Sequence, residues 1–184
     1  MQASAKKFQH GKGKMKRIAR FHKVSFEQFK EGWQDEFPEA AEEEIKQIYN
    51  EIKLPKRATA GSAGYDFFAP QSFSLKSGQT IKIPTGIRVE MAAEWVLKCY
   101  PRSGLGFKFR LQLNNTVGII DSDYFYSDNE GHIFTKLTND SNEGKTVEVG
   151  AGTGFMQGIF IEYGITLDDN VTDERNGGFG STTT

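Results

Sequence analysis

The chain has 184 residues, a net charge of −1, and a composition that is 37% hydrophobic and 26% charged, which suits one globular domain with extensions. No apolar run approaches the ~18 residues of a membrane span, no signal-peptide core follows Met1, and the near-neutral charge gives no general reason to expect binding to a membrane or a nucleic acid. Cys99 is the only cysteine, so an intramolecular disulfide is impossible, and a cytoplasmic location is expected.

The first segment, residues 1–23, is basic and contains no acidic residue. Such an arm can bind phosphate backbones, or it can be a solvated and disordered leader. We expect a disordered leader and keep nucleic-acid binding as the alternative. Met15 is a second candidate start, with residues 1–14 as an added leader.

Residues 24–52 have the spacing of a helical extension. Ser25 followed by Gln28 resembles a capping box, which predicts the start of a first helix. A second helix is expected from about Pro38 to Ile52, because proline suits a first helical turn and several glutamates follow it. Each helix has an apolar stripe that we expect to dock on the main body. The stripes comprise Phe26, Phe29, Trp33 and Phe37, and then Ile45, Ile48, Tyr49 and Ile52.

From Lys53 the hydrophobic period changes from helical to two, and short apolar runs alternate with Gly, Asn and Asp turns. This pattern predicts an all-β barrel or sandwich over residues 53–170. The order of elements lacks the βαβ unit of a Rossmann fold, and no P-loop motif occurs. The expected strands include Ile81–Ile83, Ile87–Val89, Phe109–Leu113, His132–Leu137, Thr146–Val149 and Met156–Ile165.

The chemistry available in the β region is that of acids, arginines and glycine-rich turns. His132 starts an apolar strand and is interpreted as structural, so a nucleophilic triad has little support. Asp121 ends the apolar run Gly118–Ile120, where a rigid support could hold a catalytic carboxylate, although such a run also ends ordinary strands. The sequence Arg102-Ser103-Gly104 could grip a phosphate or simply close a turn. Together these groups fit attack by water on a polyphosphate.

The tail, residues 171–184, is rich in glycine and has no hydrophobic period. It can be a frayed terminus. It can also be an arm that binds phosphate through Arg175 and backbone amides, with Phe179 stacking on a base.

Five segments in a fixed order resemble the trimeric dUTP diphosphatases (dUTPases) over about residues 54–184. The resemblance implies a jelly-roll-like β fold and a homotrimer whose sites are each built from more than one subunit. It also implies Mg²⁺-dependent hydrolysis of dUTP to dUMP and pyrophosphate, which limits uracil in DNA and supplies dUMP for thymidylate synthesis. The segments are Ala58–Asp66, Pro101–Leu105, Gly118–Tyr124, Gly152–Gln157 and Arg175–Thr182.

Three residues match the catalytic positions of these enzymes. Asp121 matches the aspartate that activates water, and Arg102 belongs to the phosphate-binding second motif. Asp66 matches the acid that supports the arginine and metal arrangement. The resemblance implies no direct protein ligand for Mg²⁺, which would be held mainly by substrate phosphates and water.

The substrate-binding positions also carry over. Tyr124 matches the aromatic residue that packs on deoxyribose and disfavours a 2′-hydroxyl, and Phe179 matches the ring that covers uracil. The tail would close over the site of a neighbouring subunit. Asn115 and the backbone through Gly118 match the hairpin that reads the edges of uracil. The full set is Ser103, Gly104, Asn115, Gly118, Tyr124, Gln157, Arg175, Phe179, Gly180 and Ser181.

The chain departs from the family pattern at three places, and two alternatives remain open. The fourth motif has Thr153 and Gly154 where an acid and an arginine are usual, the turn Phe125–Gly131 is long, and Gly106 replaces a small alanine. A dCTP deaminase of the same fold would need a proton-shuttling acid, for which Glu130 is the candidate. A dUTP-sensing regulatory protein is the second alternative, suggested by the helical extension.

Overall fold

The computed structural model describes residues 15–173 and residue 175. Two helices follow an N-terminal strand, and the rest of the described chain is mainly short strands. The elements are β1 Ala19–Lys23, α1 Phe26–Glu36, α2 Glu42–Glu51, β2 Lys56–Arg57, β3 Tyr65–Phe68, β4 Phe73–Leu75, β5 Thr80–Pro84, β6 Ile87–Met91, β7 Trp95–Pro101, α3 Ser103–Phe109, β8 Leu111–Leu113, β9 Gly118–Ile120, the 3₁₀ helix η1 Ser122–Tyr126, β10 Phe134–Asn139, β11 Val147–Val149 and β12 Gly154–Glu162.

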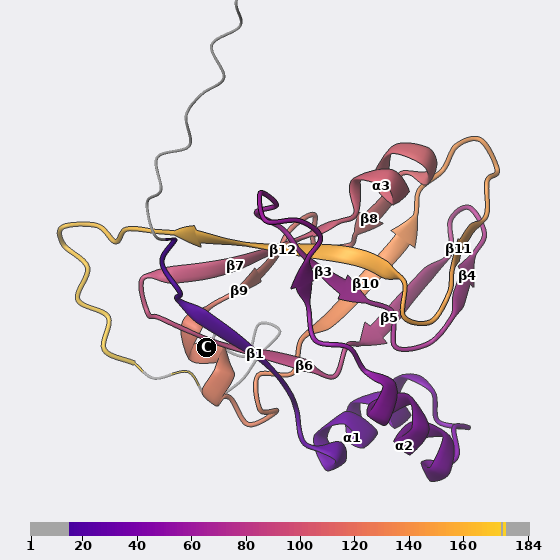
Figure 1. Cartoon of the computed structure of the whole chain (residues 1–184), viewed down its shortest axis with the longest axis horizontal. Coiled ribbons are helices and arrows are strands. Elements are labelled where there is room, and N and C mark those ends of the chain that lie inside the picture. Colours follow the sequence, from indigo (N-terminus) through magenta and orange to yellow (C-terminus); the bar gives the residue numbers. More distant parts are fainter. Residues whose placement is uncertain (1–14, 174, 176–184) are drawn as a thin grey trace, which may run out of the picture.

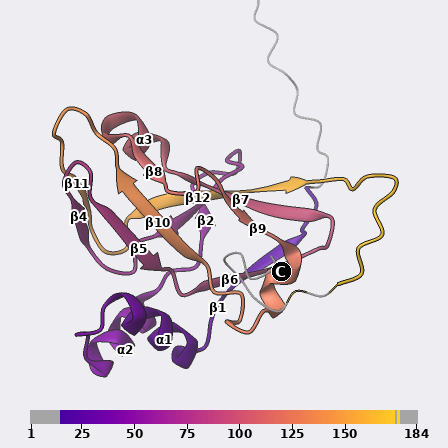
Figure 2. The ribbon, with the colours of Figure 1, turned by 180° about the vertical axis from the view of Figure 1, so that it is seen from behind.

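The described strands form four antiparallel sheets rather than one closed barrel. The largest has the order β2-β3-β12-β7-β9, and a second has the order β5-β10-β8. Buried and more exposed residues alternate along β8, β10 and β11, as a strand with one face on a core requires. The all-β prediction is therefore confirmed, with α1 and α2 grouped at one end of the body (Figures 1 and 2). None of the described helices is long and apolar enough to cross a bilayer.

One hydrophobic core joins the sheets to the helical extension. Phe67, Leu97 and Phe155 are fully enclosed, and Cys99 lies among them as a small core residue. Burial raises the pKa of the Cys99 thiol to about 12, so this cysteine stays protonated and unreactive at neutral pH.

Several element boundaries differ from the sequence prediction, among them the start of β10 at Phe134 rather than His132 and the start of β12 at Gly154 rather than Met156. The basic segment Ala19–Lys23 is expected in the disordered leader, but it forms β1 and pairs along β6, which supplies the backbone partners that a short basic segment lacks by itself. The second helix begins at Glu42 rather than Pro38, because a turn in which Ala40 N–H donates to the Phe37 carbonyl comes first. Strand β8 begins at Leu111, since Phe109 still belongs to α3.

The helical extension docks on the β body through its apolar stripes, as the sequence predicts. Phe29 and Trp33 of α1 are fully buried, as is Ile45 of α2. The contact is closest at Gly86, where a Cβ would lie 2.3 Å from the Ile52 Cδ1 and 3.1 Å from the Phe29 Cδ2. Gly86 also has a φ of +69°, so both its conformation and its neighbours require glycine.

Replacement of Gly86 by alanine measures how tightly the extension docks. We expect Gly86→Ala to lower the free energy of unfolding by about 2–4 kcal/mol, through left-handed backbone strain and overpacking. Gly78→Ala is the matched control, because Gly78 has a φ of +81° but no heavy atom within 4 Å of the place where a Cβ would lie. It should cost only about 1 kcal/mol. Urea unfolding checks both values, and equal losses would contradict close docking.

Candidate active site

Three side chains from separate motifs meet on the largest sheet. Gln157 of β12 pairs across the strands with Asp66 of β3 and with Tyr100 of β7. Arg102 follows β7, and its Nε lies 3.4 Å from the Asp66 Oδ1. Strand pairing therefore brings the first, second and fourth motifs together, with a guanidinium held beside a carboxylate.

The backbone around Arg102 explains one departure from the family pattern. The Arg102 Nη1 donates to the Gly154 carbonyl at 3.5 Å, and a Cβ at Gly154 would lie 3.0 Å from that same nitrogen. Glycine at this position thus leaves room for the guanidinium to lie over the β12 backbone. Ser103 and Gly104 come next, exposed at the start of α3.

The segment that matches the uracil-reading hairpin is the turn from β8 to β9, two strands that lie in different sheets. It borders a cavity of about 320 Å³. Asn115 and Gly118 line this cavity on the hairpin side, and Lys136 of β10 is also among its lining residues. Backbone N–H and C=O groups of a turn can read the edge of a planar base when they face such a cavity. The structure thus places both hairpin residues predicted to read uracil at one pocket.

Asp121 and Tyr124 follow β9 directly. Asp121 is the N-cap residue of η1, and its side chain is 47% exposed. Tyr124 is only 6% exposed; its hydroxyl donates to the His132 carbonyl at 2.7 Å and accepts from the Asn129 Nδ2 at 2.9 Å. Burial raises the pKa of the Tyr124 phenol, while the Asn129 hydrogen bond and the Arg175 charge act in the opposite direction.

These two groups of residues lie far apart within one chain. Ile120 pairs with Leu97, so Asp121 lies near the first residues of β7, whereas Arg102 follows its last residue. At ~3.3 Å per residue, β7 separates Asp121 from Arg102 by about 20 Å. A single chain therefore does not bring the predicted water-activating acid to the predicted phosphate-binding arginine.

Comparison with known proteins shows the family to which this chain belongs. A sequence profile described as dUTPase matches residues 50–183. The chain belongs to the dUTPase family. The deoxyuridine 5′-triphosphate nucleotidohydrolase of Lactococcus lactis is 42% identical over 71% of this chain and 88% of that protein, and the Glaesserella parasuis enzyme is 40% identical over 73% and 90%.

Solved structures of dUTPases have the same fold. The dUTPase of Streptococcus mutans superposes with a TM-score of 0.55 at 36% identity, covering 64% of this chain and 90% of that one. A mutant dUTPase of phage phi11 of S. aureus, which coordinates a structural Mg(II) ion, has a TM-score of 0.54 at 19% identity. It covers 67% of this chain and 92% of its own. The dUTPase match begins at residue 50, so α1 lies outside it.

The arm residue Arg175 contacts the third motif of its own chain. Its Nη2 donates to the Asp121 Oδ2 at 2.6 Å, and its Nε donates to the Asp123 Oδ1 at 2.9 Å. Asp123, for which the sequence indicates only a turn role, thus shares a cation with Asp121. The other predicted arm residues, Phe179, Gly180 and Ser181, lie outside the described residues.

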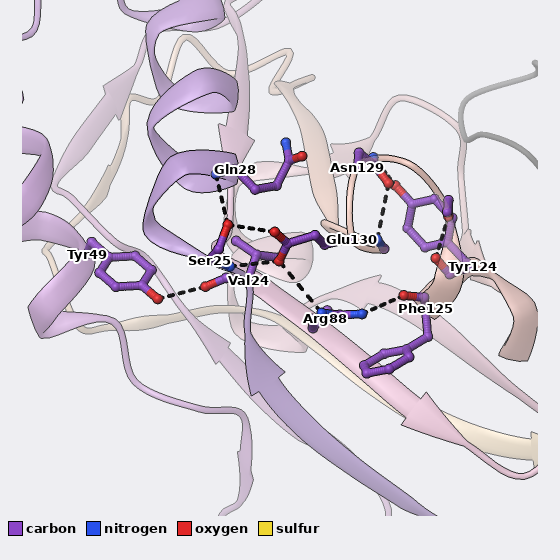
Figure 3. Close-up of polar contacts among 11 residues, drawn as sticks. Val24, Ser25, Gln28, Tyr49, Arg88, Tyr124, Phe125, Asn129 and Glu130 are labelled. Carbon is purple, nitrogen blue, oxygen red and sulfur yellow. Dashed lines mark hydrogen bonds and ion pairs between the residues drawn. The ribbon is translucent and has the colours of Figure 1, made fainter.

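The long turn after Tyr124 contains the interactions that sequence reasoning missed. Glu130 is the candidate acid for the deaminase alternative, but its carboxylate accepts hydrogen bonds from the Ser25 backbone N–H at 2.7 Å and from the Ser25 Oγ at 2.6 Å (Figure 3). The capping pattern at Ser25 is the only sequence feature near this contact, and it points to Gln28.

His132 is fully buried and its Nε2 accepts from the Gly86 N–H. Burial, reinforced by the Lys82 charge, lowers the pKa of the His132 ring to about 3, so it is neutral.

Proposed function

We propose that the protein hydrolyses dUTP to dUMP and pyrophosphate. The observation that carries the proposal is the continuous run from the hairpin cavity through β9 to Asp121 and Tyr124, within a family whose relatives are named for this reaction. The run offers a base-sized cavity, a carboxylate and an aromatic ring, which are groups that can contact the base, the phosphate ester and the sugar of a nucleotide.

Uracil would be selected by the backbone of the hairpin. Its O4 accepts and its N3–H donates, and cytosine reverses this pattern at both positions. Cytosine would therefore leave buried groups of the hairpin unpaired, at ~1–3 kcal/mol each. Tyr124 would exclude a ribose 2′-hydroxyl, because its buried ring has no room to yield.

Asp121 would act as the general base on the attacking water. An anionic carboxylate that is half exposed can orient a water towards the α-phosphorus and accept its proton. The Arg175 guanidinium is paired with the Asp121 carboxylate in the described structure. It would have to move from Asp121 onto the triphosphate when the nucleotide binds. That exchange would free the base and place a cation on the leaving group.

Mg²⁺ would enter with the triphosphate. The carboxylates of Asp121 and Asp123 converge on one cationic group, the Arg175 guanidinium, so this place is suited to a cation. Mg²⁺ prefers oxygen ligands and usually keeps several waters together with substrate phosphates. The ion, when bound, would neutralise charge on the phosphates, while these two residues would contact it mainly through its waters.

The separation of Asp121 from Arg102 supports an oligomer in which a site joins two chains. Asp121, Tyr124 and the hairpin would come from one subunit, and Asp66, Arg102 and Gln157 from the next. A homotrimer with three such sites is the assembly we propose, with cyclic symmetry closing the ring. In the cell the enzyme would keep uracil out of DNA and supply dUMP, and we expect it in the cytoplasm, where its free cysteine is stable.

The dCTP deaminase alternative is not favoured by the position of Glu130. Its carboxylate is engaged by Ser25 and lies 3.6 Å from the Arg88 Nη1, so it is not free to shuttle a proton beside a base. A role as a dUTP sensor has no specific contact in its favour among the described residues, since the helical extension is docked on the body.

The decisive experiment measures pyrophosphate release from dUTP, UTP, dTTP and dCTP in parallel with Mg²⁺ present. We expect rapid release from dUTP and at least about tenfold lower kcat/KM for each of the others. Ammonia release from dCTP is assayed alongside. Ammonia without pyrophosphate would contradict the proposal and favour the deaminase.

A further inference from the structure

We infer that Glu130 is a positioning residue that ties the sugar-recognising turn of Tyr124 to the N-terminal helical extension. The inference deepens the proposed function, and its kinetic tests rest on that function. Glu130 lies 105 residues from Ser25 in the sequence, yet it completes the cap of α1 in the fold. The contacts run along three steps, from α1 to Glu130, from Glu130 through the turn, and from the turn to Tyr124 (Figure 3).

At the first step, Glu130 takes the place of a capping-box side chain. Gln28 N–H donates to the Ser25 Oγ at 3.2 Å, which is the forward half of such a box. The reverse half, an acceptor for the Ser25 N–H, normally comes from the third helical residue. Here the Glu130 carboxylate supplies it and also accepts the Ser25 hydroxyl proton. The carboxylate that accepts the Ser25 N–H is thus in the turn after Tyr124 and not in the helix.

At the second step, Glu130 holds a strained backbone. It has a φ of +56°, a conformation that non-glycine residues adopt rarely and at a cost. Arg88 supports it, with its Nη1 3.6 Å from the Glu130 Oε2 and its Nη2 donating to the Phe125 carbonyl at 2.6 Å. The same guanidinium lies 3.7 Å from the centre of the Phe125 ring. The Arg88 side chain thus contacts both ends of the turn, through an ion pair at Glu130 and a hydrogen bond at Phe125.

At the third step, the turn closes on Tyr124. The Glu130 N–H donates to the Ser127 carbonyl, and the Asn129 side chain bonds both the Gly131 N–H and the Tyr124 hydroxyl. The hydroxyl in turn donates to the His132 carbonyl. Movement of Glu130 would therefore change the position of Asn129, and through it the tilt of the Tyr124 ring against a deoxyribose.

A second contact between the extension and this turn runs through His132. The ring of Phe29 lies 6.2 Å from the His132 ring, and the His132 carbonyl holds the Tyr124 hydroxyl. This apolar contact keeps α1 in place when the polar one is lost. Removal of the Glu130 carboxylate should therefore leave a folded protein with a looser turn, which makes the inference testable.

The test compares Glu130→Gln and Ser25→Ala with two controls. Lys30→Ala alters the same helix at a surface ion pair with Glu27 and Glu42, and Ser25→Thr keeps the hydroxyl. Hydrogen exchange of residues 124–132 is measured without nucleotide. We expect about tenfold faster exchange in the first two variants and wild-type rates in both controls, because only the first two weaken the hydrogen bonds between Ser25 and the Glu130 carboxylate.

The kinetic readout is the ratio of kcat/KM for dUTP to that for UTP, with KM and kcat reported separately. We expect the ratio to fall about tenfold in Glu130→Gln and Ser25→Ala, mainly through KM, and to stay unchanged in the controls. A lower Tm with unchanged exchange and an unchanged ratio would overturn the inference and leave Glu130 a purely structural residue. If wild-type protein releases no pyrophosphate from dUTP, the proposed function fails, and the exchange rates alone decide the inference.

Discussion

The variant Asp121→Asn should still bind dUTP but turn it over at least about 100-fold more slowly than the wild type. The amide has nearly the shape of the carboxylate but cannot accept the proton of the attacking water, and loss of a general base has this magnitude. Arg175 would keep the Asp123 contact in the variant, so the arm should still reach the third motif. Single-turnover pyrophosphate release and equilibrium binding of a non-hydrolysable dUTP analogue measure the two properties separately.

The matched control for this substitution is Asp128→Asn. Asp128 is an exposed acid in the turn after Tyr124, and its replacement removes the same charge without touching the run from β9 to Tyr124. Its turnover should stay within about twofold of wild type. Wild-type turnover in Asp121→Asn would remove Asp121 from the mechanism. A large loss in both variants would assign the effect to the net charge of the turn.

The parts of the fold that could be predicted are those whose cause is local. Period-two alternation is a property of consecutive residues, so the sequence predicts a strand over His132–Leu137, and the structure has it two residues later, at Phe134–Asn139. The Ser25 cap is visible for the same reason, and the structure confirms its bond to the Gln28 N–H. What escapes prediction depends on partners distant in sequence. Strand β1 exists because β6 offers it an edge, and nothing in the basic segment itself signals that edge.

In the candidate site, too, the features that depend on partners distant in sequence could not be predicted from local patterns. The proximity of Asp66 and Arg102 follows from the pairing of β3, β12 and β7, which no local pattern specifies, and it is expected only through the family resemblance. The capping pattern at Ser25 does not reveal its contact with Glu130, because a capping side chain normally lies three residues away, where the chain has Gln28. The left-handed backbone conformation of Glu130 could not be predicted either, since glutamate rarely adopts a positive φ.

The second large effect is expected when two inactive variants are mixed. Asp121→Asn and Arg102→Ala should each lower turnover about 100-fold or more, the first by removing the base and the second by removing a cation from the phosphates. If a site takes Asp121 from one chain and Arg102 from another, random mixing of equal amounts of the two chains gives some intact sites. A quarter of the sites, roughly, would hold both wild-type residues, so about a quarter of wild-type activity should return.

The mixing experiment tests the separation of about 20 Å directly, as estimated from ~3.3 Å per residue along β7. The two proteins are unfolded together and refolded, so that their chains can exchange, and pyrophosphate release from dUTP is followed. Each variant refolded alone serves as the control and should stay inactive. No recovery in a mixture shown by mass spectrometry to contain hybrid oligomers would contradict a shared site. Because the described chain holds Asp121 and Arg102 at opposite ends of β7, such a result would require that strand to rearrange when dUTP binds.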